Sequence, residues 1–207
     1  MRILLLTIAT VLFSISLTAQ NNIDDANFDD SIKYSIFYGI NYSYVENYGN
    51  DGFKGERSGY NAGLVAEMPF AKRWSFEGSL FFSTVGEQPI DEEGERVARF
   101  RTYTINLPVQ FKYYFSDKKD FSIHIGPNLS YNFEPRIFEN RNQDFRTLEE
   151  IVRTGFDGTA GFGYKFPGFG LWVKGTFSYG FADIFVNTDV YQSERFKIIR
   201  FDIGYQF

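Results

Sequence analysis

The sequence predicts an all-β fold, an eight-stranded antiparallel transmembrane β-barrel with up-and-down meander order. Three observations lead to this prediction. The chain begins with an export signal, the remainder alternates between apolar and polar residues in about eight segments, and the connections between segments are alternately long and short. Short turns then collect at one end of the barrel, and we expect this end to be periplasmic and to hold both chain termini.

The composition excludes several classes of protein. The chain has 207 residues and no cysteine, which excludes disulfides, Fe–S clusters, thiolate zinc sites, a cysteine nucleophile and a lipid-anchored cysteine. The net charge of −5 argues against nucleic-acid binding. The mean hydropathy of −0.27 excludes a bundle of membrane helices, although 20% of the residues are aromatic.

Residues 1–19 have the features of a signal peptide. Arg2 is followed by an uncharged apolar run, and Ala19 offers a small residue before a polar stretch. The run is short for a membrane span, so a retained anchor helix is the less favoured alternative. We therefore expect cleavage before Gln20, a short periplasmic segment over residues 20–30 and a barrel domain over residues 31–207 of an exported protein.

The first four segments alternate with the two-residue period of a strand. In 34–44, tyrosine and isoleucine alternate with smaller residues such as serine, glycine and asparagine. In 60–70, Tyr, Ala, Leu, Met and Phe occupy one face, and in 74–83 Trp, Phe and Leu alternate with Ser and Glu. The segment 103–115 is the cleanest, since Tyr, Ile, Leu, Val and Phe occupy every second position.

The last four segments follow the same period. In 121–133, aromatic and aliphatic residues alternate with Ser, His and Asn, and in 156–166 the opposite face is rich in glycine. Segments 169–181 and 199–207 place Lys, Arg and Asp opposite Phe, Ile and Tyr. Pro108 and Pro127 interrupt two of these strands, and we expect a bulge or a local bend at each.

The two faces differ in a way that favours a membrane barrel over a soluble sandwich. One face is almost uniformly large and apolar, which suits lipid, and the other is small, polar or charged, which suits a narrow interior. Aromatic residues next to the short turns are expected to form an interfacial girdle. They are Tyr34, Phe70, Trp74, Phe115, Phe121, Phe166, Phe169 and Phe207. Tyr205 and the final Phe207 resemble the C-terminal signature that the barrel-insertion machinery reads.

Four acids and four bases are expected to face the interior by parity. They are Glu67, Glu77, Asp157, Asp202, Lys112, Lys165, Lys174 and Arg200. Isolated buried ions are costly, and an eight-stranded barrel has room for little more than side chains, so we interpret these residues as a plug of paired charges. Because the first strand carries no inward charge, we expect Arg200 to pair within its own strand or with Glu67 or Glu77.

No residue pattern predicts catalysis, a cofactor or a metal site. His124 is the only histidine and is expected in a polar network inside the barrel. The acidic run from Glu87 to Glu95 could bind cations, but a solvated loop is the favoured interpretation. In 140–153, a capping-box pattern at Thr147 would place Phe145, Leu148 and Val152 on one face of a short helix, either a lid or a partner site.

Four runs resemble the PorT-like outer-membrane β-barrel family of Bacteroidota. They are 103–115 with its proline in mid-strand, 125–127, 161–164 and 178–184. The resemblance covers nearly the whole mature chain. It implies an eight-stranded barrel in the outer membrane of a Gram-negative cell, among relatives described as porin-like, some of which take part in secretion or gliding machinery.

The leading functional hypothesis is a structural barrel, or one that interacts with a protein partner through its surface loops, with outer-membrane lipid around it. A porin-like channel for small solutes and a component of a secretion assembly remain alternatives. A lipid-active enzyme is disfavoured because the single histidine is expected inside the barrel. A soluble exported barrel with an apolar ligand cavity is the remaining alternative.

Overall fold

A computed structural model describes residues 30–47, 57–87, 98–139, 144–147, 153–181 and 194–207. The signal-peptide prediction lies outside these residues. Nine strands are formed within them. They are β1 (Lys33–Asn47), β2 (Arg57–Ala71), β3 (Trp74–Glu87), β4 (Ala98–Tyr114), β5 (Phe121–Glu139), β6 (Asp144–Thr147), β7 (Thr154–Lys165), β8 (Leu171–Gly180) and β9 (Glu194–Gln206).

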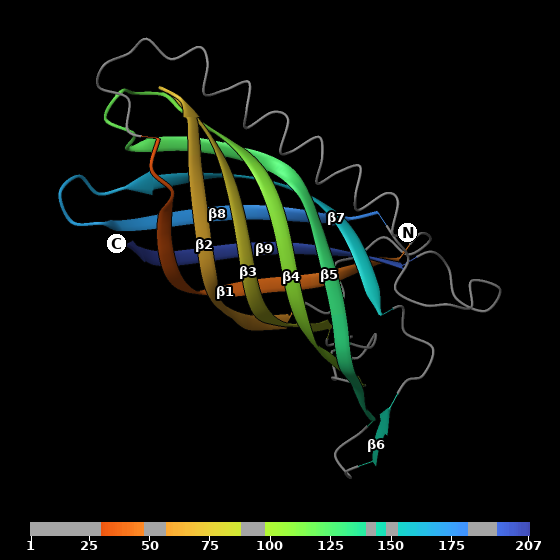
Figure 1. Ribbon diagram of the computed structural model, residues 1–207. Helices are drawn as coiled ribbons and strands as arrows, with labels where there is room; N and C mark the ends of the chain where they lie inside the picture. The colour runs from red at the N-terminus through yellow and green to blue at the C-terminus, as the bar shows by residue number, and fades with distance from the viewer. Residues whose placement is uncertain (1–29, 48–56, 88–97, 140–143, 148–152, 182–193) are drawn as a thin grey trace.

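Eight of the strands form one closed antiparallel sheet, as the sequence predicts. Neighbours along the chain pair with each other, the β1–β9 pairing joins the first and last strands, and β5 pairs with both β4 and β7. The result is a barrel whose strands are strongly tilted and coiled (Figure 1). No helix in the described ranges is long and apolar enough to cross a bilayer.

The ninth strand, β6, was not expected. It pairs only with the end of β5, at Arg136–Glu139, and extends beyond the barrel wall (Figure 1). Phe145 therefore lies in a strand, paired with Phe138, and not in the short helix considered from the sequence. Leu148 and Val152 lie outside the described residues.

The short connections lie where they were predicted. Residues 72–73 join β2 to β3, 115–120 join β4 to β5 and 166–170 join β7 to β8. In the last turn Gly168 and Gly170 have φ values of 80° and 69°, a left-handed conformation that glycine adopts without strain. Both ends of the sheet near the chain termini, the start of β1 and the end of β9, lie at this same short-turn end.

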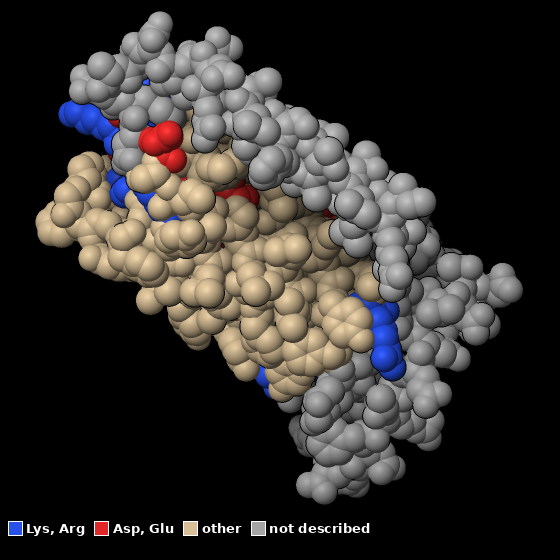
Figure 2. All heavy atoms as spheres, viewed as in Figure 1, with Lys and Arg blue, Asp and Glu red and all other residues tan. Residues whose placement is uncertain are grey.

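The distribution of buried residues is the reverse of that in a soluble domain. The exposed set is dominated by large apolar residues from every barrel strand, whereas most buried side chains are polar or charged. In β4, for example, Leu107 and Val109 are 48% and 41% exposed, while Asn106 and Gln110 are 5% and 3% exposed. The wall seen in Figure 2 accordingly shows few charged atoms between the two ends. The predicted assignment of faces is confirmed.

The two prolines do not introduce bulges. The β3–β4 and β4–β5 registers are the same on both sides of Pro108 and Pro127, so no extra residue is inserted. Instead, the pairing between neighbouring strands is interrupted near each proline. Leu107 and Pro108 have no partners in β3, and Val109 and Gln110 have none in β5, opposite Gly126 and Pro127. The expected bulge is therefore absent at both prolines, because a missing N–H removes hydrogen bonds without changing register, and the alternative expectation of a local bend stays a prediction.

Candidate functional site: the barrel interior

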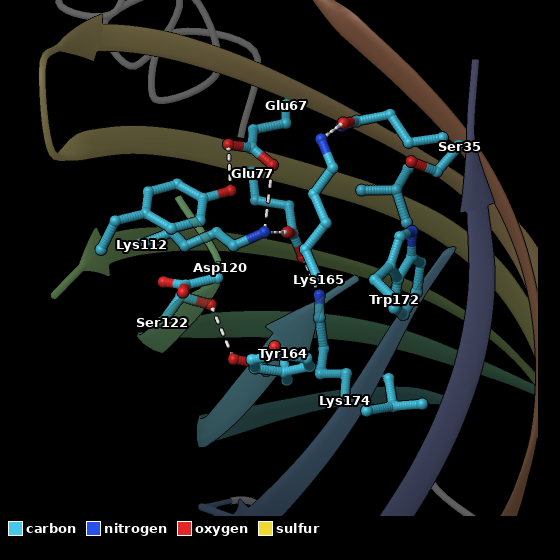
Figure 3. A pocket seen from close by; sticks show the side chains of 15 residues that line it. Ser35, Glu67, Glu77, Lys112, Asp120, Ser122, Tyr164, Lys165, Trp172 and Lys174 are labelled. Atoms are coloured by element: carbon cyan, nitrogen blue, oxygen red, sulfur yellow. Dashed lines mark hydrogen bonds and ion pairs between the residues drawn. The ribbon is translucent and has the colours of Figure 1, made fainter. Parts of the chain in front are cut away.

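A charged cluster crosses the interior near the short-turn end. Glu67 of β2 and Glu77 of β3 are direct cross-strand neighbours, an arrangement that like charges alone would destabilise. The Lys112 ammonium of β4 lies between them, with its Nζ 3.0 Å from an Oε2 atom of each (Figure 3). From the far wall, Lys174 of β8 donates to the Oε1 atom of Glu77. The hydroxyl of Tyr114 donates to Glu67 Oε1 at 2.6 Å.

This cluster is well shielded from water. The side chains of Glu67, Glu77 and Lys174 are 6%, 2% and 9% exposed. Buried ions need both opposite charges and hydrogen bonds, and here two carboxylates meet two ammonium groups and one hydroxyl. The cluster therefore links strands β2, β3, β4 and β8 across the interior.

The other four predicted charges take neutral partners among the described residues. Asp202 accepts from the amide of Asn61, Asp157 accepts from Asn128 at 2.8 Å, and Lys165 donates to the amide oxygen of Gln206. All four lie at the inward positions that parity assigns, but within the described part of the chain they form no ion pairs with each other. Four of the eight predicted residues thus form one ion-paired network, and the other four do not join it.

Arg200 does not form the ion pair that was expected for it among the described residues. Its guanidinium carbon lies 4.6 Å from the ring centre of Phe81, a cation–π contact, and its Nε has no hydrogen-bond partner among the described residues. The expected pairing with its own strand, with Glu67 or with Glu77 does not hold among these side chains. Phe81 is buried beside Arg200, at an inward position where the alternation of the segment 74–83 predicts small or polar groups.

An apolar cluster beside these charges was missed from the sequence. Phe37, Val65 and Phe81 are buried together, and Trp172 packs against them. The Phe37 ring centre lies 5.7 Å from that of Phe81 and 6.0 Å from that of Trp172. Trp172 has the same parity as Lys174, so a bulky residue at an inward position was the signal that could have revealed this cluster.

The indole of Trp172 needs a glycine opposite it. Gly204 is the direct cross-strand partner of Trp172, and a Cβ atom at residue 204 would collide with the indole ring. The absent side chain therefore leaves the space that the indole ring occupies. Trp172 and the ion-paired cluster together occupy the interior near its short-turn end.

A small cavity remains at this end. It has a volume of about 20 Å³ and is lined by charged, polar and apolar side chains that include Lys112, Lys165, Trp172 and Lys174 (Figure 3). A cavity needs roughly 10–15 Å³ of such volume to hold one water molecule. The space is therefore sufficient for about one water molecule and is far smaller than a solute path.

The histidine lies in the polar interior. His124 is 2% exposed, its Nε2 lies 3.0 Å from the Thr176 hydroxyl, and its Nδ1 has no partner among the described residues. Ser122, on the same face, bonds to the carbonyl oxygen of Gly163 and not to His124. The described residues contain no group of three or more acidic, histidine or cysteine side chains that could hold a metal ion.

Two short turns are joined at the rim. Asp117, between β4 and β5, accepts from Lys72 at 3.0 Å and from Arg73 at 2.9 Å, both between β2 and β3. These two hydrogen bonds hold the pKa of the Asp117 carboxyl below its usual range, because both favour the charged form. Nearby, the rings of Phe115 and Phe121 lie 5.3 Å apart and Trp74 lies 4.7 Å from Tyr113, which places aromatic pairs where a girdle was predicted.

The C-terminal aromatics face outward. Tyr205 and Phe207 are 48% and 69% exposed, and the Phe207 N–H donates to the carbonyl oxygen of Tyr34 at 3.0 Å. The last residue is therefore held against the first strand. Whether the insertion machinery reads these two residues stays a prediction.

Comparisons with known proteins agree with this architecture. A family model described as the outer membrane protein beta-barrel domain matches residues 18–186. The structure of Neisserial surface protein A superposes with a TM-score of 0.54 at 11% identity, covering 86% of this chain and 99% of that one. Ail of Yersinia pestis, in complex with the heparin analogue sucrose octasulfate, gives 0.50 at 13% identity, with coverages of 86% and 99%. No sequence among the curated proteins matches the chain.

Proposed function

Because the chain belongs to the outer membrane protein beta-barrel domain family, we propose that it is a closed, non-conducting barrel that acts through its long loops. Family membership places it in the outer membrane, with its apolar outer face toward lipid. The proposal concerns what the barrel does there.

The filled interior is the observation that carries the proposal. The ion-paired cluster spans from β2 to β8, and the Phe37, Val65, Phe81 and Trp172 cluster packs beside it. Farther along, the side-chain amide of Asn128 donates to Asn106 and to Asp157. The cavity of about 20 Å³ is too small for a hydrated solute. A barrel of eight strands with such an interior supports a scaffold and not a pore.

The loops are then the part of the chain left to meet a partner. The barrel wall offers lipid-facing apolar residues and the interior is closed to solutes, so recognition is assigned to the connections around residues 48–56, 88–97 and 182–193 and to the hairpin of β5 and β6. We infer a protein partner at these connections. Binding of a nucleic acid is disfavoured by the net charge of −5.

Three finer assignments belong to this proposal. The mid-strand Pro108 and the Ile125-Gly126-Pro127 run support membership of the PorT-like subgroup of Bacteroidota, some of whose members serve secretion assemblies. The short turns are assigned to the periplasmic side, because short turns lie there in bacterial barrels. We also infer that the chain is not an enzyme, since His124 meets a threonine hydroxyl and no activated nucleophile.

Conductance in a planar bilayer tests the closed barrel. The purified wild-type monomer is expected to give no steady current. A variant with Phe81→Ala, Trp172→Ala and Arg200→Ser, which empties one side of the interior, serves as the control that shows the assay can detect an open lumen. Heat-modifiable migration in detergent checks that this variant is folded. A stable ohmic conductance from the wild type would overturn the proposal and favour a porin-like channel.

Crosslinking in intact cells tests the loop partner. A photoreactive residue in the 182–193 connection should capture a defined protein, whereas the same residue at the lipid-facing position Leu129 should not. Equal capture from both positions would contradict recognition through the loops.

A further inference from the structure

Arg200 is a buried cation whose Nε donor is not used. Its residue is 6% exposed, and its guanidinium carbon lies over the ring of Phe81. A guanidinium has five N–H donors and no acceptor, and Arg200 Nε has no hydrogen-bond partner among the described residues. Because buried charges need hydrogen bonds as well as opposite charges, this side chain calls for a further acceptor.

Asp202, two residues along the same inward face of β9, is not that acceptor. Gly39 of β1 is the register partner of both Asp202 on β9 and Asn61 on β2. A Cβ atom at residue 39 would collide with both side chains, so the glycine lets the amide of Asn61 donate to the carboxylate of Asp202. The carboxylate is thus held by a neutral amide and forms no ion pair with Arg200 within the described part of the chain.

An amide oxygen beside Arg200 has the opposite shortage. Asn41 is the register partner of Arg200 where β1 and β9 close the barrel (Figure 1), and such partners lie about 4.5–5.5 Å apart at Cα. The amide of Asn41 donates to Asn61 Oδ1 at 3.3 Å, whereas Asn41 Oδ1 is buried and accepts from none of the described residues. An unused donor and an unused acceptor therefore lie on two neighbouring inward residues.

We propose that an ordered water molecule binds between Arg200 and Asn41, where it accepts from Arg200 Nε and donates to Asn41 Oδ1. A buried water molecule makes about three hydrogen bonds, and the carboxylate of Asp202 offers the third partner. The water molecule then joins Arg200 to Asp202 as a water-mediated ion pair across the seam between the first and last strands.

The mixture of donors and acceptors selects water over an ion. A chloride ion would accept from Arg200 but would be repelled by Asp202, which lies about 6.6–6.8 Å farther along the same face of the strand. A metal cation would bind the oxygen of Asn41 but would be repelled by the guanidinium. Water both donates and accepts, so it satisfies all three groups without adding charge.

This inference goes beyond the proposed function. A bound water molecule in this layer of the interior is compatible with a barrel that conducts and with one that does not. The conductance measurement and the test below can therefore fail independently of each other.

The nuclear Overhauser effect between Arg200 Hε and water tests the proposal. The mature barrel carries ¹⁵N-labelled arginine in nanodiscs, and Arg200→Lys identifies the Hε signal. We expect a cross peak at the water frequency with opposite signs in NOE and ROE spectra, which distinguishes bound water from proton exchange. Asn41→Leu removes the amide acceptor, so this variant should lose the cross peak.

Two controls sharpen the result. Arg73 Nε donates directly to Asp117 Oδ1 at 2.9 Å on the exposed rim, so its Hε should give no bound-water peak. Thr176→Val removes the hydroxyl of the register partner of Arg200 on β8 and should leave the cross peak unchanged. Heat-modifiable migration checks that both variants are folded.

The wild type alone can refute the proposal. Absence of the cross peak, or an Hε signal lost to exchange with bulk water, would overturn it. Persistence of the cross peak in Asn41→Leu would also overturn it, as would its loss in Thr176→Val, since the hydroxyl would then relay the signal. An Hε shift that follows the chloride concentration would replace the water molecule by an anion.

Discussion

Removing Lys112 should destabilise the barrel more than removing any exposed lysine. Its ammonium lies 3.0 Å from both Glu67 and Glu77, whose side chains are 6% and 2% exposed. In Lys112→Met, Glu77 keeps Lys174, but among the described residues Glu67 keeps only the hydroxyl of Tyr114. Breaking a buried ion pair by removing one partner costs about 3–5 kcal/mol, which is the loss in unfolding free energy that we expect.

A second substitution separates lost charge balance from lost packing. In Lys112→Met with Glu67→Gln, the remaining charges are the paired Glu77 and Lys174, and the amide can still accept from Tyr114. This double variant should recover about 1–3 kcal/mol relative to Lys112→Met, because no carboxylate is left unpaired in the cluster. Adding a substitution should therefore stabilise the protein.

Urea unfolding in neutral-lipid vesicles, followed by tryptophan emission and by heat-modifiable migration, measures these differences. Lys118→Met, in an exposed turn, is the matched control and should change stability by no more than about 0.5 kcal/mol. If the double variant is no more stable than Lys112→Met, the buried charge is not the source of the loss and the reasoning fails.

The remaining predictions address the outer face, the rim and the export signal. Leu107→Arg should cost about 2–4 kcal/mol in vesicle-based urea unfolding if the site lies near the bilayer midplane, while Leu107→Phe, which keeps an apolar surface, should cost far less. Measured by NMR, the pKa of the Asp117 carboxyl should lie below its ordinary value, and Arg73→Gln should raise it. The stabilisation that the charged Asp117 gives by joining the two turns is present above the unfolded pKa of the carboxyl. It is lost as the pH falls through the lowered folded pKa. An upward shift that is missing in Arg73→Gln would contradict the assigned cause. Intact mass of the membrane-inserted protein should show Gln20 as the first residue, and retention of Met1 would refute the predicted cleavage.

The alternation of residues was sufficient to predict the wall of the barrel. A strand has a side-chain period of two, so each apolar position in 103–115 or 121–133 assigns its neighbours to the other face without knowledge of any partner strand. Turn length gave the meander order for the same reason, because a connection of a few residues can join only adjacent antiparallel strands. The short strand β6 could not be predicted in this way, since four residues of mixed polarity are too few to show an alternation of apolar and polar side chains.

The contacts inside the barrel were decided by the tertiary structure. Parity indicated that eight charged residues face inward, but the register and tilt of all eight strands determine which of them meet across the interior. Lys174 is the register partner of Asp202 on the neighbouring strand, yet its ammonium reaches Glu77 on the far wall, while Arg200 lies over Phe81. The sequence by itself thus determined which side chains enter the interior, because facing is a local property of a strand. Their partners depend on the closed barrel, because those distances exist only once every strand is in place.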